Sequence, residues 1–241
     1  MIKTIFIDFD DTLWDTKGNN RKALEELYTL LDWGRGYSSF DVFWEKYYPL
    51  NEYQWTLYRD GIISKHELMY NRFAMVLEPL GISSEEEIAM INDLFLRKTS
   101  VMSGVVEGTF PLLEYLKRFY KVVILSNGFR EVQRSKMNAA GITPYIDHLV
   151  LSEDARCNKP CKRIFDYAFS VTNSRPRETI MIGDNWDADI VGAQNARIPS
   201  IWFNPTKELR TLPTTVVSAP IFEVEHLDRI PAILREMIPV F

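Results

Sequence analysis

Apolar residues occur along this chain in short runs, which are separated by longer segments of helical periodicity. Three runs rich in β-branched or aromatic residues predict buried strands, at Thr4–Phe9, Lys121–Ser126 and Thr179–Gly183. Two weaker runs predict further strands, at His148–Ser152 and Pro199–Phe203. Because helical segments lie between the runs, the pattern predicts an α/β fold in which a doubly wound, mostly parallel sheet carries helices on both faces.

The C-terminal part of the chain follows this pattern less regularly. Proline, threonine and serine are frequent in Thr211–Pro220, so we expect a loop or a short edge strand there. The last helix is predicted to run from about Glu223 to Glu236.

The segment from residue 17 to residue 100 shows no convincing strand and several helix starts. Ser64–Glu67 and Ser84–Glu87 match the capping box, in which a hydroxyl and a carboxylate satisfy free backbone donors. The predicted helices span about 20–31, 40–59, 64–80 and 84–99. Pro49 lacks a backbone donor, so it is expected to interrupt or kink the second helix. We therefore expect an α/β core from residues 1–16 and 101–241, with an all-helical domain of residues 17–100 inserted after the first strand.

Composition excludes several classes of protein. Of the 241 residues, 46% are hydrophobic and 25% are charged, which is typical of an ordered globular protein. The net charge of −5 argues against a nucleic-acid polymer as partner. No apolar run approaches the roughly 18 residues that a membrane span needs, and Asp8 interrupts the N-terminal run too early for a signal peptide. With only two cysteines, Cys157 and Cys161, we expect a cytoplasmic protein without a disulfide framework.

The sequence Asp8-Phe9-Asp10-Asp11-Thr12 directly follows the first predicted strand. Three carboxylates in four positions repel one another, and burying them at a strand end is costly without a cation. In a strand, Asp8 and Asp10 point to the same side, so both could face one metal ion or one substrate. The alternative, an acidic turn solvated at the surface, fits poorly with an apolar strand that runs straight into the cluster.

Three further polar groups follow later strands. Ser126 and Asn127 end the second strong strand, Asp184 follows the third, and Lys159 lies in a loop between them. Each group is a weak signal by itself, because serine, asparagine and lysine are common in turns and loops. Ligands of doubly wound sheets, however, bind beyond the carboxyl ends of the strands. Carboxylates, a hydroxyl, an amide and a lysine are the groups that hold Mg²⁺ and a phosphoryl group.

These motifs resemble, in order and spacing, the four motifs of the haloacid dehalogenase superfamily. The resemblance covers essentially the whole chain and rests on Asp8-Phe9-Asp10-Asp11-Thr12, Ser126, Lys159, and Gly183-Asp184 followed by Asp189. It implies a Rossmann-like core. The aspartate at position 10 further implies the phosphatase branch, because the dehalogenases of the superfamily lack it and work without a metal.

The resemblance also implies the role of each residue. Asp8 would be the nucleophile that forms an aspartyl-phosphate, and Asp10 would protonate the leaving oxygen and then activate water. Mg²⁺ would be bound by the Asp8 carboxylate, the Asp10 backbone carbonyl and Asp184. The remaining motif residues would bind phosphate or support the metal ligands: Ser126, Asn127 and Lys159 for phosphate, and Thr12 and Asp189 for support.

The long segment between Asp10 and Ser126 implies, in this family, a helical cap that closes over the site and contacts the leaving group. Ten aromatic residues lie within residues 33–58. They are either a stacking surface for a nucleobase or the core of the helical domain. Helical spacing favours the core for Phe40, Phe43, Trp44, Tyr47 and Tyr48. Three aromatics outside this spacing are expected to act in specificity instead: Trp33, Tyr37 and Tyr53.

Three stretches look like the bacterial house-cleaning pyrimidine 5′-nucleotidases: residues 55–64, 162–168 and 183–196. This likeness implies a small-molecule substrate, a pyrimidine nucleoside 5′-monophosphate, although Cys161 stands where relatives usually carry aspartate. Rival functions are a sugar-phosphate phosphatase, a phosphomutase or a phosphonate hydrolase of the same fold. A phospho-accepting regulatory protein or an inactive binding protein belongs to a different class. The sequence leaves the oligomeric state open.

Overall fold

The computed structural model describes residues 1–211 and 219–237, which form two compact units. The sheet unit comprises Met1–Thr16 and Ser103–Phe241, and the helical unit comprises Lys17–Met102. Within the described residues, no helix combines the length and the apolar character that crossing a membrane requires.

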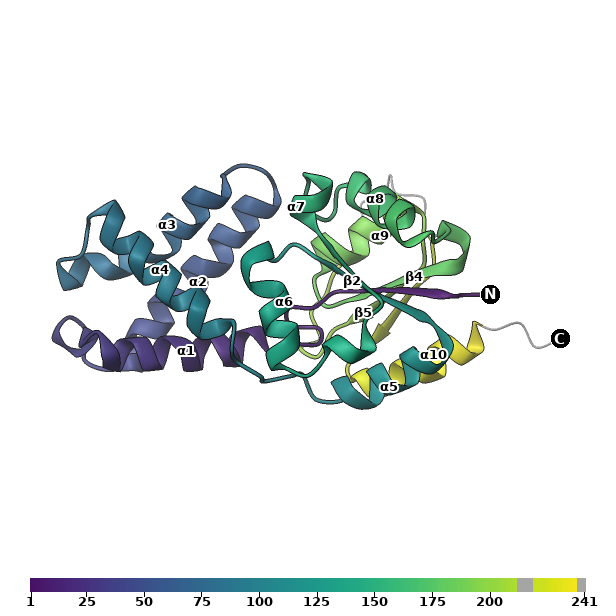
Figure 1. The fold of residues 1–241 in the computed structure, drawn as a ribbon, viewed down its shortest axis with the longest axis horizontal. Coiled ribbons are helices and arrows are strands. Elements are labelled where there is room, and N and C mark those ends of the chain that lie inside the picture. The colour runs from purple at the N-terminus through teal and green to yellow at the C-terminus, as the bar shows by residue number, and fades with distance from the viewer. Residues whose placement is uncertain (212–218, 238–241) are drawn as a thin grey trace. The chain divides into compact units, whose positions relative to one another are not determined.

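The sheet unit contains one six-stranded sheet with the strand order β3-β2-β1-β4-β5-β6, in which every neighbouring pair is parallel. The strands are β1 (Thr4–Ile7), β2 (Lys121–Ser126), β3 (His148–Leu151), β4 (Thr179–Gly183), β5 (Ser200–Phe203) and β6 (Ile221–Val224). The α-helices of this unit are α5 (Thr109–Phe119), α6 (Arg130–Ala139), α7 (Ser152–Ala155), α8 (Lys162–Thr172), α9 (Val191–Ala196) and α10 (Ile230–Glu236). In Figure 1, α8 and α9 cover one face of the sheet, and α5 and α10 lie together on the other. The predicted doubly wound α/β fold is confirmed.

The predicted strands agree with the structure to within two residues at their ends. The first strand ends at Ile7 rather than at Phe9. The Asp8 backbone N–H still donates to Ile182 of β4, but the Phe9 carbonyl accepts from the N–H groups of Leu13 and Trp14. This tight turn takes the chain out of the sheet directly after Asp8, so the carboxylates of the first motif lie at its edge.

The predicted start of the last helix is wrong. Glu223 lies in β6, which pairs with β5, and the helix α10 begins only at Ile230. The Glu223 carboxylate accepts a hydrogen bond from the Asn204 side chain, which ties β6 to the end of β5. A four-residue strand gives too short an alternation to stand out against the helical pattern that follows it. Most of the predicted loop Thr211–Pro220 lies outside the described residues.

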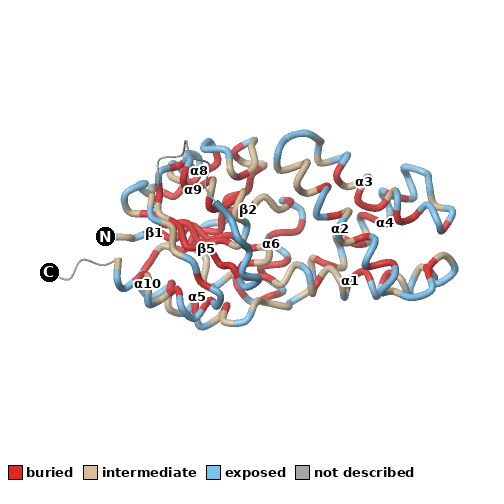
Figure 2. The backbone as a smooth tube through the Cα atoms, turned by 180° about the vertical axis from the view of Figure 1, so that it is seen from behind, coloured by how far each residue is buried: buried red, intermediate tan, exposed pale blue. Residues whose placement is uncertain are grey.

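The core of the sheet unit lies on both faces of the central strands, which Figure 2 shows as buried. All four residues of β1 are buried, and Phe6 packs with residues of β2, β4 and α8 in one apolar cluster. The strand order reverses at β1, because β2 pairs with it on one side and β4 on the other. The carboxyl ends of these three strands therefore meet where a doubly wound sheet binds its ligands.

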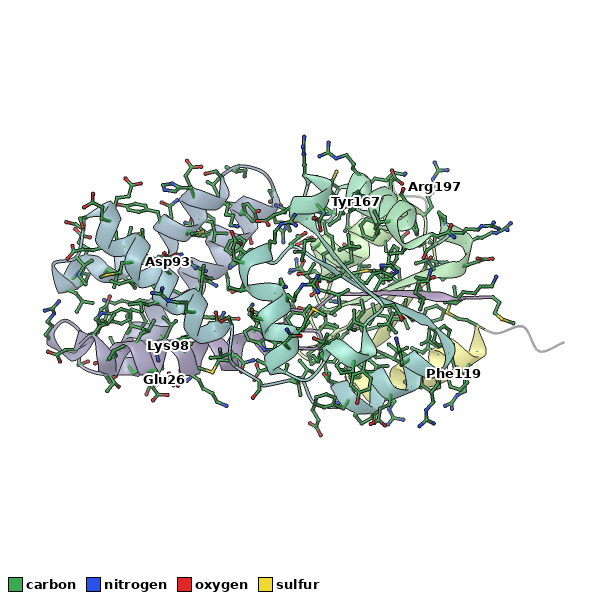
Figure 3. All side chains as sticks on the ribbon, in the orientation of Figure 1. Glu26, Asp93, Lys98, Phe119, Tyr167 and Arg197 are labelled. Atoms are coloured by element: carbon green, nitrogen blue, oxygen red, sulfur yellow. The ribbon has the colours of Figure 1, made fainter. Side chains whose placement is uncertain are left out.

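The helical unit is built from four longer helices and two short 3₁₀ turns. These are α1 (Thr16–Leu30), α2 (Phe40–Arg59), α3 (Lys65–Leu77) and α4 (Glu85–Thr99), with 3₁₀ turns at Trp33–Arg35 and Glu78–Leu80. Ser64 and Glu67 form the predicted capping box. At α4 the Ser84 hydroxyl accepts from the Glu87 N–H as predicted, but the Glu87 carboxylate accepts from this hydroxyl instead of from the Ser84 backbone. Figure 3 shows Lys98 of α4 close to Glu26 of α1, and their side chains form an ion pair of 2.6 Å.

The helix α2 continues through Pro49, so an interruption is wrong, whereas the alternative, a kink, stays a prediction. Proline removes the hydrogen bond that its N–H would make to the carbonyl of residue 45. Pro49 and Glu45 are both exposed, and water can satisfy that carbonyl instead. Tyr47 and Asn51 flank Pro49 and are buried, so packing of the opposite face offsets the lost bond.

The aromatic residues of the first half of α2 form the core of the helical unit, as their spacing predicts. Phe43 and Tyr47 are fully buried and stack with ring centroids 5.8 Å apart. Trp33 and Tyr37 are buried as well, with ring centroids 4.9 and 5.3 Å from that of Phe43. The expectation that these two lie outside the core is therefore wrong, because the 3₁₀ turn folds Trp33 back onto α2. Tyr53 is 59% exposed.

We expect Trp33→Ala to destabilise the helical unit by about 3–5 kcal/mol, because it leaves a large cavity in a packed core. Tyr53→Ala removes an exposed ring and is expected to change stability by less than about 0.5 kcal/mol. Urea unfolding of both variants, followed by circular dichroism, measures the difference. Equal effects of the two substitutions would contradict this description of the core.

Candidate active site

The motif residues come together where β1, β2 and β4 end. Asp8 follows β1, Ser126 is the last residue of β2, and Asp184 follows β4. Lys159 reaches them from the loop between α7 and α8. Because neighbouring parallel strands end at the same edge, side chains that are far apart in the sequence become neighbours there.

A buried ammonium group lies at the centre of this cluster. Lys159 is 2% exposed, and its Nζ lies 2.5 Å from Asp8 Oδ1 and 2.7 Å from Asp189 Oδ1. The Asn127 side chain fixes the backbone of this lysine, because it accepts from the Lys159 N–H at 2.8 Å and donates to the Lys159 carbonyl at 3.1 Å. The end of β2 and the lysine loop are thus held together.

Asp189 lies on a short π-helical turn, Trp186–Ile190, a type of turn that is frequent at functional sites. Its Oδ2 accepts from the Asn185 N–H at 3.1 Å, while Oδ1 contacts Lys159. A Cβ atom on Gly183 would overlap the Asp189 side chain. The glycine that ends β4 therefore allows Asp189 to lie fully buried against the strand end.

Asp184 is held by Thr12 and Trp202. The Thr12 hydroxyl donates to Asp184 Oδ1 at 2.6 Å and accepts from the Asp184 N–H at 3.0 Å, so it fixes both the side chain and the backbone. The Trp202 indole N–H donates to the Asp184 carbonyl at 2.8 Å. Carboxylate oxygens of Asp8, Asp184 and Asp189 lie within 4.8 Å of one another.

One ammonium cannot neutralise three neighbouring carboxylates. Burial raises the pKa of Asp8 to about 8; Asp189 and Asp10 add to this shift, whereas Lys159 opposes it. Burial also raises the pKa of Asp184 well above its ordinary value, and the carboxylates of Asp8 and Asp189 raise it further. For Lys159, burial lowers the pKa, but the carboxylates of Asp189 and Asp8 outweigh burial, so its pKa is raised.

This charge imbalance fits a divalent cation. Mg²⁺ prefers oxygen ligands and is usually bound by one or two carboxylates together with water and substrate phosphate. Asp8 and Asp184 offer that donor set, with an excess of buried negative charge that a cation would relieve. Asp189 is already engaged by Lys159 and by the Asn185 N–H, so it is better suited to supporting these ligands.

Ser126 lies beside this cluster and is 1% exposed. Its Oγ accepts from the Gly128 N–H at 2.9 Å and from Gln133 Nε2 at 2.7 Å. A hydroxyl accepts two hydrogen bonds and donates one. With both acceptor positions used, the proton of Ser126 is directed to another acceptor, as a phosphoryl oxygen would be.

Asp10 is bound by two residues of α6, Gln133 and Lys136, that belong to none of the four motifs. Lys136 Nζ lies 2.9 Å from Asp10 Oδ1, and Gln133 Nε2 donates to Asp10 Oδ2 at 2.6 Å. Thr16 makes a longer contact of 3.4 Å to Oδ1. A signal was present in the sequence: Gln133 and Lys136 lie one turn apart on the helix face that also carries apolar Val132 and Met137, where a polar residue is unexpected.

Comparison with known proteins identifies the family of this chain. A model of the haloacid dehalogenase-like hydrolases matches residues 2–197. The pyrimidine 5′-nucleotidase YjjG of Escherichia coli (strain K12) is 29% identical over 92% of this chain and 96% of its own length. The pyrimidine 5′-nucleotidase PynA of Streptococcus pneumoniae is 27% identical over 84% of each chain.

Two further relatives extend the comparison. The glyceraldehyde 3-phosphate phosphatase of Methanothermobacter thermautotrophicus is 28% identical over 85% of this chain and 86% of its own length. The magnesium-bound crystal structure of the HAD-hydrolase YfnB from Bacillus subtilis has the same fold, with a TM-score of 0.85, 24% identity and coverage of 97% and 98% of the two chains. The family predicted from the four motifs is confirmed, and the chain belongs to the haloacid dehalogenase-like hydrolases.

Proposed function

We propose that this protein hydrolyses phosphate monoesters through an aspartyl-phosphate on Asp8, with Mg²⁺, and that its substrates are pyrimidine nucleoside 5′-monophosphates. One observation carries the proposal. The Asp8 carboxylate is held 2.5 Å from the buried ammonium of Lys159, and a second carboxylate, Asp10, follows two residues later. This arrangement supplies a nucleophile, a fixed positive charge and a proton-transfer group at one strand end.

In the first step, a carboxylate oxygen of Asp8 attacks phosphorus. The bond between phosphorus and the ester oxygen breaks, and the leaving alcohol takes a proton from the Asp10 carboxyl group. Lys159 offsets the charge of the phosphoryl oxygens, without which an anionic nucleophile would be repelled by an anionic phosphate. Asp189 keeps the ammonium in place. The Ser126 hydroxyl donates its free proton to one phosphoryl oxygen, and Asn127 acts through the position of Lys159.

In the second step, a water molecule attacks the phosphorus of the aspartyl-phosphate. Asp10, now a carboxylate, removes a proton from this water, and phosphate leaves with Asp8 restored. Bound at Asp8, at Asp184 and at the Asp10 backbone carbonyl, Mg²⁺ would neutralise charge on the nonbridging oxygens. Thr12 fixes Asp184 for that role through its two hydrogen bonds.

The family and its phosphatase relatives make the chain a phosphoric monoester hydrolase. The finer proposal, a pyrimidine nucleotide as substrate, is supported by two relatives that carry the name pyrimidine 5′-nucleotidase over most of both chains. A second candidate is a sugar phosphate or a triose phosphate, which is favoured by the glyceraldehyde 3-phosphate phosphatase at 28% identity.

Measuring kcat/KM for a panel of monoesters with Mg²⁺ tests the substrate class. We expect pyrimidine 5′-monophosphates to exceed hexose and triose phosphates by about tenfold or more, which is what one well-placed stacking contact provides. A clear preference for the sugar phosphates would overturn the nucleotide proposal and leave the phosphatase chemistry intact.

Asp8→Asn is expected to lower turnover of the best substrate by at least about a hundredfold, because an amide is a poor nucleophile. Asp228→Asn is the matched control, since this exposed aspartate of the same unit precedes α10 and lies outside the motifs. Phosphate release measured for both variants decides the matter. Wild-type activity in Asp8→Asn would contradict the covalent mechanism.

Mg²⁺ is expected to stabilise the protein more as pH rises. In the metal-free folded state Asp8 has a pKa of about 8, so it keeps its proton below that pH. In the unfolded chain it already ionises near the ordinary pKa of an aspartate. Between these values the folded state holds more protons, so metal-free stability falls as pH rises. Bound Mg²⁺ requires ionised ligands and removes this loss.

Thermal unfolding at about pH 6 and about pH 8, with and without Mg²⁺, measures the effect. The rise in melting temperature should be larger at the higher pH and absent in Asp184→Asn, while Asp228→Asn should respond as the wild type does. A rise that is equal at both pH values, or retained in Asp184→Asn, would contradict the metal site.

A further inference from the structure

Two polar residues on the buried face of α6 meet the Asp10 carboxylate from the same side. Gln133 is fully buried and Lys136 is 8% exposed. Both lie one helical turn apart, so their side chains project from the same face. Long polar side chains are rarely buried to this degree unless they are paired. Their pairing with Asp10 therefore needs an explanation beyond packing.

Lys136 uses its ammonium in two ways. Nζ lies 2.9 Å from Asp10 Oδ1 and 4.0 Å from the centre of the Trp14 ring. The ring face and the carboxylate both attract a cation, so they hold the side chain in one position. An ammonium that is fixed between a ring and Asp10 is poorly placed to reach a substrate as well.

Gln133 joins Asp10 to Ser126. Its Nε2 donates to Asp10 Oδ2 at 2.6 Å and to Ser126 Oγ at 2.7 Å, so both amide hydrogens are used. Within the described residues, Gln133 Oε1 has no hydrogen-bond partner. The reverse orientation of the amide would turn this oxygen onto a carboxylate. Leaving a buried acceptor unsatisfied is costly, so the site keeps this orientation for the two donors that it presents.

Gly128 makes room for this arrangement. A Cβ atom at this position would overlap the Gln133 amide and would lie 3.0 Å from Asp10 Oδ2. The glycine after Ser126 and Asn127 therefore does more than end the strand. Its lack of a side chain lets α6 bring Gln133 against the first motif.

We propose that Lys136 and Gln133 are positioning residues that hold the two oxygens of the Asp10 carboxylate for proton transfer to the leaving alcohol and from the attacking water. The inference rests on the proposed function, since it assigns these residues a part in the Asp10 step. The Asp10 carboxylate is joined to its backbone by two rotatable bonds, and one donor on each oxygen fixes both rotations. Proton transfer by a well-placed group contributes about 10²–10⁴-fold to rate, and it is lost when the group moves out of line.

Lys136→Met and Gln133→Met remove the donors and keep an unbranched side chain of similar length. Lys117→Met is the matched control, because it breaks an ion pair of 2.6 Å with Asp147, which precedes β3, in the same unit. Each variant is assayed with an alkyl phosphate and with 4-nitrophenyl phosphate, whose leaving group needs little protonation. Rapid mixing separates the first turnover from the steady rate.

With the alkyl ester, we expect kcat to fall by about tenfold or more in both α6 variants, with KM within about threefold of wild type. With the aryl ester, the first turnover should stay within about threefold of wild type while the steady rate falls, because the attacking water still needs Asp10. Lys117→Met should keep both rates. A rise in KM alone, or an equal loss for both esters in the first turnover, would overturn the proposal.

Combining each α6 variant with Asp10→Asn separates positioning from a general loss of structure. If Lys136 acts through Asp10, Lys136→Met costs nothing further in the Asp10→Asn background. Gln133→Met also removes a donor to Ser126, so in that background it keeps only the part of its cost that Ser126 carries. The same loss in both backgrounds would overturn the inference. Asp10→Asn with wild-type turnover would instead overturn the proposed function of Asp10. If Asp10→Asn is impaired while Lys136→Met and Gln133→Met are fully active, only the inference is overturned.

Discussion

The ammonium of Lys159 lies between Asp8 and Asp189 with almost no access to solvent, and Asp184 adds a third carboxylate at the same strand ends. Breaking one partner of such a buried pair leaves an uncompensated charge, which typically costs about 3–5 kcal/mol. Two apolar residues of similar volume would avoid this cost, so stability alone does not account for the cluster. A divalent cation would account for it, because its two positive charges offset the excess that one ammonium leaves among three carboxylates.

This cluster depends on the parallel sheet. Each of three neighbouring strands contributes one polar end, and the reversal of strand order at β1 brings those ends together. That these three residues meet could therefore be predicted from the sequence, because Asp8, Ser126 and Asp184 each directly follow or end an apolar run. The bounds of β2 and β4 could be predicted to the residue for the same reason, since a polar residue stops each buried run abruptly.

Other features depend on contacts between segments that are distant in sequence, and local patterns do not contain them. Gln133 and Lys136 interrupt the apolar face of α6 in the sequence, but only the packing of α6 beside Asp10 shows what they bind. The spacing of Trp33 does not match that of α2 and so predicts a position outside the core, yet a 3₁₀ turn brings this ring back onto Phe43. The strand β6 could not be separated from the following helix, since its edge position is defined only by pairing with β5.

The proposed mechanism requires that the phosphoryl group is bound covalently to Asp8 as an aspartyl-phosphate during turnover. Acid quenching during turnover, followed by peptide mass spectrometry, tests it most directly, and Asp10→Asn is the variant in which the intermediate should persist. The account predicts one added phosphoryl group on the peptide that contains Asp8. This group should be absent from a control without substrate. An enzyme that turns over phosphate esters while this peptide stays unmodified, or that carries the phosphoryl group on another residue, would contradict it.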